Sequence, residues 1–173
     1  MAHARDAAVA LMTRRGFDAV TVEEVAAAAS VSPSTLYRYF GTKEALVLTS
    51  QRPAGLVERL RQDDSDRSWF EAFRRAAVKV WAGDDDAGAE LTLYVANPPL
   101  LQAWERQLLD QRDGIAAAFA RRRGKSGGAK DATRAAVSVA VLTTALLRWN
   151  ADGGGKKALD RVLVKGFDAV ATP

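Results

Sequence analysis

Apolar side chains recur every three or four residues along most of the chain. Near the N-terminus the pattern includes Ala4, Ala8, Val22 and Val25, and similar runs continue almost to the C-terminus. This spacing puts the apolar side chains on one face of a helix, whereas a strand would need strict alternation. The pattern therefore predicts an all-α fold of about nine helices, with no convincing strand.

Two short helices near the N-terminus have clear capping signals. Thr21 is suited to cap the first of them, and Glu24 lies three residues later, where it completes a capping box. Ser32 is the expected N-cap of the second, with Pro33 at the first helical position, where proline needs no amide hydrogen. A tight turn joins the two helices, so the segment is predicted to be a helix-turn-helix.

The second of these helices has a polar face suited to reading DNA. On a helical wheel Leu36 and Phe40 point inward, which leaves Ser34, Thr35 and Arg38 on the outer face. Hydroxyl groups can bind bases or phosphates, and arginine can pair with guanine in the major groove through two hydrogen bonds. We therefore expect this helix to contact double-stranded DNA.

A further helix is expected to begin just after this one. Thr42 is its predicted cap and places Lys43 at a helix N-terminus, which is a favourable position for a phosphate contact. Tyr37 and Tyr39 flank the inward face of the preceding helix. Either tyrosine alone is more typical of packing, so only the ordered set of residues favours DNA binding.

Residues 16–26 (Gly-Phe-Asp-Ala-Val-Thr-Val-Glu-Glu-Val-Ala) and 35–40 (Thr-Leu-Tyr-Arg-Tyr-Phe), with Lys43-Glu44, resemble the N-terminal domain of TetR-family transcriptional regulators. The resemblance implies an all-helical homodimer that holds an inverted-repeat operator, as a repressor, until a small molecule binds the C-terminal domain. By position it assigns DNA contacts to Thr21, Thr35, Tyr37, Tyr39 and Lys43, and the helical wheel adds Ser34 and Arg38. We expect a DNA-binding domain at 1–45 and a ligand-binding and dimerisation domain at 46–173.

Two residues depart from the family pattern. Ser30 stands in the turn where glycine is common in the family, and glycine relaxes the left-handed residue that ends a helix. We therefore expect a slightly strained turn. Glu23 places an acid near the expected position of the phosphates, although it also favours the helix dipole.

Composition limits the class of protein more than it identifies the function. The chain has 173 residues and no cysteine, which is consistent with a reducing cytoplasm, and no apolar run is long enough to span a membrane. The net charge is +4, yet the first fifty residues carry five basic and five acidic side chains. The basic surplus lies further on and includes Arg121, Arg122, Arg123, Lys125 and Lys130, so the net charge is not an argument for DNA binding.

The remaining helices carry four structural expectations. A break is expected near Pro53, because proline disfavours a helix interior, and Asn97 is expected to cap a helix that runs from Pro98 to about Arg123 with Gly114 as its weak point. The helix over 130–151 is apolar nearly all round, so we expect a partner subunit to cover part of it. In the last helix, over 156–171, Gly166 would permit a close crossing with its symmetry mate.

Large aromatic residues of the middle helices are candidates for a pocket as well as for a core. Residues 97–107 and 148–154 also resemble the C-terminal domain of a TetR subgroup associated with acyl-CoA-like ligands. This resemblance implies an elongated, mostly apolar effector. The candidate ligand-binding residues are Trp69, Phe73, Tyr94, Asn97, Trp104, Leu108, Thr143 and Leu147.

Three other functions compete with a ligand-responsive regulator. One is a DNA-binding dimer with a solid core and no effector, and another is a carrier of hydrophobic ligands with a vestigial DNA-binding head. Enzyme activity is disfavoured because cysteine is absent, His3 is the one histidine, and no Ser elbow or HExxH motif occurs. Asp84, Asp85 and Asp86 suit a helix start better than a metal site. We therefore expect no catalytic residues, no metal and no cofactor.

Overall fold

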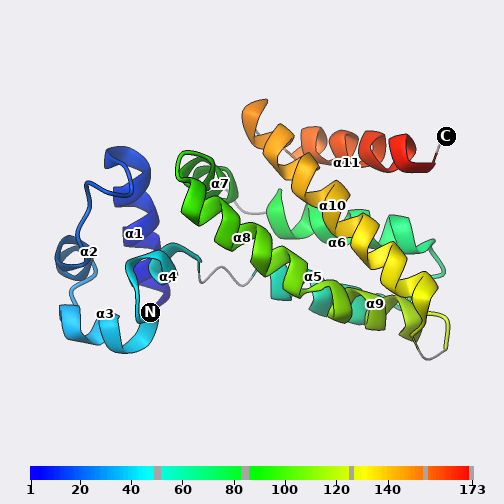
Figure 1. The fold of residues 1–173 in the computed structure, drawn as a ribbon, viewed down its shortest axis with the longest axis horizontal. Coiled ribbons are helices and arrows are strands. Elements are labelled where there is room, and N and C mark those ends of the chain that lie inside the picture. The colour runs from blue at the N-terminus through cyan, green and yellow to red at the C-terminus, as the bar shows by residue number, and fades with distance from the viewer. Residues whose placement is uncertain (49–51, 83–85, 125–126, 154–155, 172–173) are drawn as a thin grey trace. The chain divides into compact units, whose positions relative to one another are not determined.

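Helices joined by short turns make up the chain, and a computed structural model describes them for residues 1–48, 52–82, 86–124, 127–153 and 156–171. Within these ranges there are eleven helices and no strand, which confirms the predicted fold class. They are α1 (Ala2–Arg15), α2 (Val22–Ala28), α3 (Pro33–Phe40), α4 (Lys43–Leu48), α5 (Arg52–Arg61), α6 (Trp69–Trp81), α7 (Asp86–Val95), α8 (Pro98–Asp110), α9 (Arg112–Arg121), α10 (Ala129–Ala151) and α11 (Lys156–Ala171) (Figure 1).

The helices form two compact units that do not follow the chain order. The first unit comprises residues 1–50 and 88–104, and the second comprises residues 51–87 and 105–173. The sequence suggested a boundary between residues 45 and 46. It gave no sign that residues 88–104, from the middle of the chain, pack with the N-terminal helices.

Polar contacts of Tyr94 and Glu90 join residues 88–104 to the N-terminal helices. The Tyr94 hydroxyl donates a hydrogen bond of 2.8 Å to the Val47 carbonyl of α4. Arg5 of α1 forms an ion pair with Glu90, whose side chain is almost fully buried. A buried carboxylate is costly unless it is paired, so this contact satisfies a charge that the unit has taken out of water.

Pro53, near which a break was predicted, lies in the first turn of a helix. Helix α4 ends at Leu48 and α5 begins at Arg52, so Pro53 is the second residue of α5. Proline is tolerated in the first turn of a helix, because amide groups there have no partner within the helix. The segment Arg52-Pro53-Ala54-Gly55, expected to interrupt a helix, therefore starts one.

The single helix predicted from Pro98 to about Arg123 is divided at Gln111. The backbone of Gln111 donates to the Leu108 carbonyl at 3.1 Å, which tightens the end of α8 before α9 begins at Arg112. Gly114 was the predicted weak point, but it lies inside α9. A Cβ placed on Gly114 would come within 3.0 Å of a Val57 methyl group, so this glycine permits α5 and α9 to pack closely.

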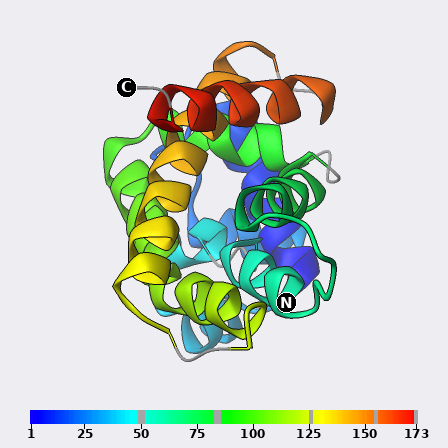
Figure 2. The ribbon, with the colours of Figure 1, turned by 90° about the vertical axis from the view of Figure 1, so that its right-hand side faces the viewer.

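Aromatic side chains form the centre of the second unit. Phe73 lies with its ring centroid 6.4 Å from that of Phe119 and 6.0 Å from that of Phe167. Trp69 packs edge-on against the same two rings, at 5.7 and 5.8 Å. Phe167 belongs to α11, outside the middle helices whose aromatic residues the sequence singled out, and its ring contacts show that the last helix completes this core. Figure 2 shows α11 beside α10.

Arg122 fastens the end of α9 to the link between α5 and α6. Its guanidinium donates to the carbonyls of Asp63, Ser65 and Arg67 at 2.6–2.8 Å and forms a 3.0 Å ion pair with the Asp63 carboxylate. Burial raises the pKa of Asp63, but hydrogen bonds from Ser65 and Arg122 lower it by more, so the pKa lies below its ordinary value of 3.8. Asp63 therefore stabilises the fold above that value, and the contribution is lost as the pH falls through the lowered pKa.

The neighbouring arginines are also engaged within the second unit. Arg121 donates to the Arg61 carbonyl at 2.6 Å, and Arg123 forms an ion pair with Asp131, which is fully buried at the start of α10. These arginines are part of the basic surplus noted in the sequence. The structure uses them to connect α9 to other parts of the unit.

Helices α10 and α11 pack against each other within one subunit. A Cβ placed on Gly166 would lie 2.8 Å from a methyl group of Val141, so this glycine makes room for α10 of the same chain. The expectation that Gly166 faces its symmetry mate is therefore corrected. Part of α10 still remains outside the core, and Ala136, Ala140 and Thr144 are exposed there at helical spacing.

Candidate nucleic-acid interface

The start of α2 is fixed by the predicted capping box. The Thr21 hydroxyl accepts a hydrogen bond from the Glu24 amide at 3.2 Å, and the Thr21 amide donates to the Glu24 carboxylate at 2.8 Å. Arg15 adds an ion pair of 2.8 Å to Glu24. The Thr21 amide and then Arg15 lower the pKa of Glu24 below its ordinary value. Thr21 is exposed, but its hydroxyl already accepts a hydrogen bond that caps α2.

The turn between α2 and α3 is strained as the sequence predicted. Ser30 has a φ of 55° and is the one non-glycine residue with positive φ among the described residues. The Val31 amide reaches back to the Ala26 carbonyl at 3.0 Å, which closes the turn. An L-residue in this conformation costs roughly 1–2 kcal/mol.

Replacement of Ser30 by glycine is expected to stabilise the protein by about 0.5–1 kcal/mol, because relief of the strain exceeds the entropic cost of glycine. The free energy of unfolding, measured in urea, checks this. Ala27→Gly is the control, because Ala27 is exposed in ordinary helical conformation and should lose about 1 kcal/mol. Destabilisation by both substitutions would contradict the assigned strain.

Hydroxyl groups gather at the N-terminus of α3. The Ser32 oxygen accepts from the Thr35 amide at 3.2 Å and lies 2.9 Å from the Ser34 hydroxyl and 2.8 Å from the Thr35 hydroxyl. Leu36, which is 1% exposed, holds the helix on the core of the first unit. The N-terminus of α3 is thus an ordered polar surface, and Ser34 and Thr35 are both part of it.

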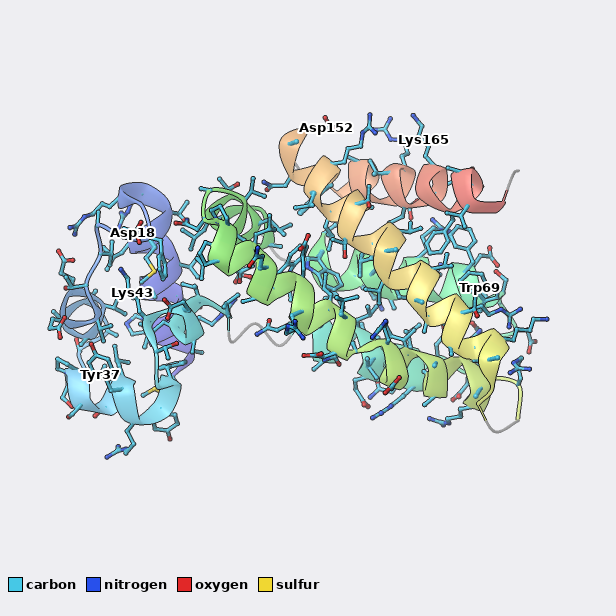
Figure 3. All side chains as sticks on the ribbon, viewed as in Figure 1. Asp18, Tyr37, Lys43, Trp69, Asp152 and Lys165 are labelled. Atoms are coloured by element: carbon cyan, nitrogen blue, oxygen red, sulfur yellow. The ribbon has the colours of Figure 1, made fainter. Side chains whose placement is uncertain are left out.

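The outer face of α3 carries two large exposed aromatic side chains. Tyr37 is 49% exposed and Tyr39 is 64% exposed, and Figure 3 shows Tyr37 on this helix. Arg38 is also exposed and makes no ion pair or side-chain hydrogen bond to any described residue. Leu36 packs on the inner side of α3, and the exposed side chains of Tyr37, Arg38 and Tyr39 are available to a partner.

Lys43 lies at the start of α4, but its ammonium group has a neighbour. The nitrogen sits 4.5 Å above the Phe17 ring, and the Thr42 hydroxyl caps the helix by accepting from the Ala45 amide at 3.2 Å. Figure 3 labels Lys43 in the first unit, near α4. The cation–π contact directs the side chain without neutralising its charge.

The seven candidate DNA contacts all belong to the first unit. Ser34, Thr35, Tyr37, Arg38 and Tyr39 share α3, whereas Thr21 and Lys43 begin the helices on either side. Arg5 and Arg15 each form an ion pair with an acidic residue. Arg38, in contrast, forms no ion pair with any described residue. The structure thus supplies a projecting helix with one unpaired arginine.

The candidate ligand-binding residues are divided between the units. Trp69, Phe73, Leu108, Thr143 and Leu147 belong to the second unit, and Tyr94, Asn97 and Trp104 belong to the first, where Tyr94 and Trp104 stack with centroids 6.1 Å apart. Internal hydrogen bonds occupy their polar groups: Tyr94 donates to Val47, Thr143 to Val139, and Asn97 to Leu93. Asn97 was expected to cap α8, but its side-chain amide binds the end of α7.

Comparison with known proteins identifies the first unit. Residues 4–49 match the family described as bacterial regulatory proteins, tetR family. Residues 4–49 therefore form a domain of the TetR-family type. A TetR-family relative is the HTH-type transcriptional regulator BetI of Rhizobium meliloti, which is 41% identical over 58 residues. That match covers 34% of this chain and 28% of BetI.

Solved TetR-family structures have the same fold over nearly the full length. Thermus thermophilus FadR, a TetR-family repressor solved with lauroyl-CoA, is 26% identical with a TM-score of 0.64, covering 96% of this chain and 90% of FadR. A TetR-family regulator of Mesorhizobium loti is 22% identical with a TM-score of 0.65, covering 96% and 92%. Bacillus subtilis FadR, solved with stearoyl-CoA, is 19% identical with a TM-score of 0.60, covering 95% and 97%.

These matches support the resemblance to TetR-type regulators that the sequence predicted. Within the described residues no three His, Cys, Asp or Glu side chains are grouped as metal ligands. Asp84 and Asp85 lie outside those residues. None of the helices in the described stretches is both long enough and apolar enough to cross a membrane.

Proposed function

We propose that this TetR-family protein is a homodimeric repressor that uses α3 to read an inverted-repeat operator. The observation that carries this proposal is the exposed face of α3, where Tyr37, Arg38 and Tyr39 project from a helix anchored by Leu36. A helix of eight residues spans about 12 Å, comparable to the width of the DNA major groove. Lys43 and the hydroxyls near Ser32 suit phosphate contacts.

Selection of bound sequences from a random DNA library tests this proposal. A symmetric dimer should enrich an inverted repeat whose half-sites are one helical turn apart, about 34–36 Å, or a multiple of it. The exposed outer face of α10 supports the assignment of a dimer. Enrichment of a single half-site would contradict the homodimer, and no enrichment at all would overturn DNA reading.

The proposed effector is a small apolar molecule of the acyl-CoA class that releases the protein from DNA. Support comes from the two FadR structures, which contain lauroyl-CoA and stearoyl-CoA. Support also comes from a hollow of about 350 Å³ in the second unit, lined mainly by Trp69, Phe70, Val137 and Phe167. Release from DNA requires that the effector bind the DNA-incompetent state more tightly.

The packing also favours a second candidate, a regulator without an effector. Phe73 and Leu108 are at most 1% exposed, so a ligand that contacts them must displace neighbouring side chains. Thermal unfolding in the presence of fatty acyl-CoA compounds separates the two candidates. An effector at 100 times its dissociation constant adds about 2.7 kcal/mol to the free energy of unfolding. If the core is solid and binds no effector, the unfolding midpoint does not change.

A further inference from the structure

Basic side chains surround a second, larger hollow in the second unit. This hollow has a volume of about 1120 Å³ and is lined by residues of α5, the link after it, α6 and α11. It is large enough for a small-molecule ligand. Six cationic side chains line it: Arg59, Arg67, Arg74, Arg75, Lys79 and Arg161.

The two acidic residues that line this basic hollow already have partners. Asp160 forms an ion pair with Arg74 across α11 and α6. Asp63 is paired with Arg122, which does not line the hollow. In contrast, Arg59, Arg67, Arg75 and Lys79 are exposed, and their side chains make no ion pair or hydrogen bond with the described residues.

Among the described residues, the lining of the basic hollow has six basic and two acidic side chains, an excess of four positive charges. Arg75 and Lys79 also lie one turn apart on α6, where like charges repel. Such a concentration of cations is destabilising until an anion neutralises it.

We propose that the basic hollow binds a small molecule that carries two or more phosphate groups. Several unpaired cations converge on one concave site, and arginine and lysine are the usual partners of phosphate oxygens. One carboxylate would leave most of this charge unmatched. The concave shape favours a compact polyanion over duplex DNA. The inference depends only on the second unit, and it holds whether or not α3 reads an operator.

Titration calorimetry at constant ionic strength with tripolyphosphate, and separately with coenzyme A, tests the proposal, with sulfate as the comparison anion. Saturable binding of either compound with sulfate much weaker is expected. Arg75→Ala with Lys79→Ala should weaken that binding by at least roughly tenfold. The matched control, Arg106→Ala with Lys165→Ala, also removes two exposed cations but lies outside the hollow. It should leave binding within about twofold of the unaltered protein.

Three results would overturn the proposal. The first is that neither phosphate compound binds the protein saturably. The second is that the control variant loses as much polyphosphate affinity as the Arg75 and Lys79 variant. The third is that the Arg75 and Lys79 variant loses affinity for duplex DNA while polyphosphate binding is absent. Thermal unfolding establishes that each variant is folded, which is expected because the substituted side chains are exposed. Operator selection is a separate measurement, so failure of the DNA-reading proposal is distinguished from failure of this one.

Discussion

Arg38→Ala combined with Tyr37→Phe is expected to weaken binding to the selected operator by about 2–4 kcal/mol, or roughly 30- to 700-fold. Arg38 is the unpaired cation on the outer face of α3, and Tyr37 is a half-exposed neighbour with a free hydroxyl. Loss of both removes a potential bidentate base contact and one hydrogen bond. Gel shift at fixed salt concentration measures the change.

The matched control for this variant is Arg106→Ala, which removes the same charge from an exposed position on α8. It should change operator affinity much less, since net charge alone is a weak determinant of specific binding. The unfolding midpoint of the double variant should stay close to that of the unaltered protein, because neither side chain packs in the core. Wild-type affinity in the double variant would exclude the docking proposed for α3.

Arg122→Ala is expected to destabilise the protein by about 3 kcal/mol. The Arg122 side chain is only 9% exposed, donates hydrogen bonds to three backbone carbonyls and forms an ion pair with one carboxylate. Its removal leaves several acceptors without a donor at a partly buried site. Urea denaturation followed by circular dichroism measures the change in the free energy of unfolding.

Arg121→Ala is the neighbouring control, because the Arg121 side chain is 64% exposed and its ion pair with Asp64 is 4.0 Å long. It should cost less than about 1 kcal/mol. Arg122→Lys should rescue little, since lysine lacks the planar fork that reaches several carbonyls. The Arg122→Ala variant should also lose part of its acid sensitivity below pH 3.8, because the pKa of Asp63 returns toward its ordinary value. Equal losses for Arg121→Ala and Arg122→Ala would contradict this assignment.

Features set by neighbouring residues could be predicted from the sequence. The capping box of Thr21 and Glu24, the cap at Ser32 and the strain at Ser30 depend on residues within one or two turns, and all three are confirmed. The exposed face of α3 followed from helical periodicity. Its DNA contacts stay predictions, because exposure alone does not determine which side chains contact bases or phosphates.

Features set by distant residues could not be predicted. The pairing of Arg5 with Glu90 joins residues 85 positions apart, and no local pattern selects Glu90 from the other acids. The division of the predicted helix at Gln111 was also missed, because Gly114 looked weaker by helix propensity. The basic hollow was missed for the same reason, since its cations come from three helices and a link.

The packing of residues 88–104 with the N-terminal helices determines which fragments of this protein can fold. A fragment that ends at residue 50 would leave Arg5 without its carboxylate partner and the Val47 carbonyl without its phenol donor, and it would expose apolar side chains to water. A chimaera that transfers the first unit to another protein must therefore carry two separate stretches of the chain. The transferable part is defined by its three-dimensional packing and is not one continuous segment of the sequence.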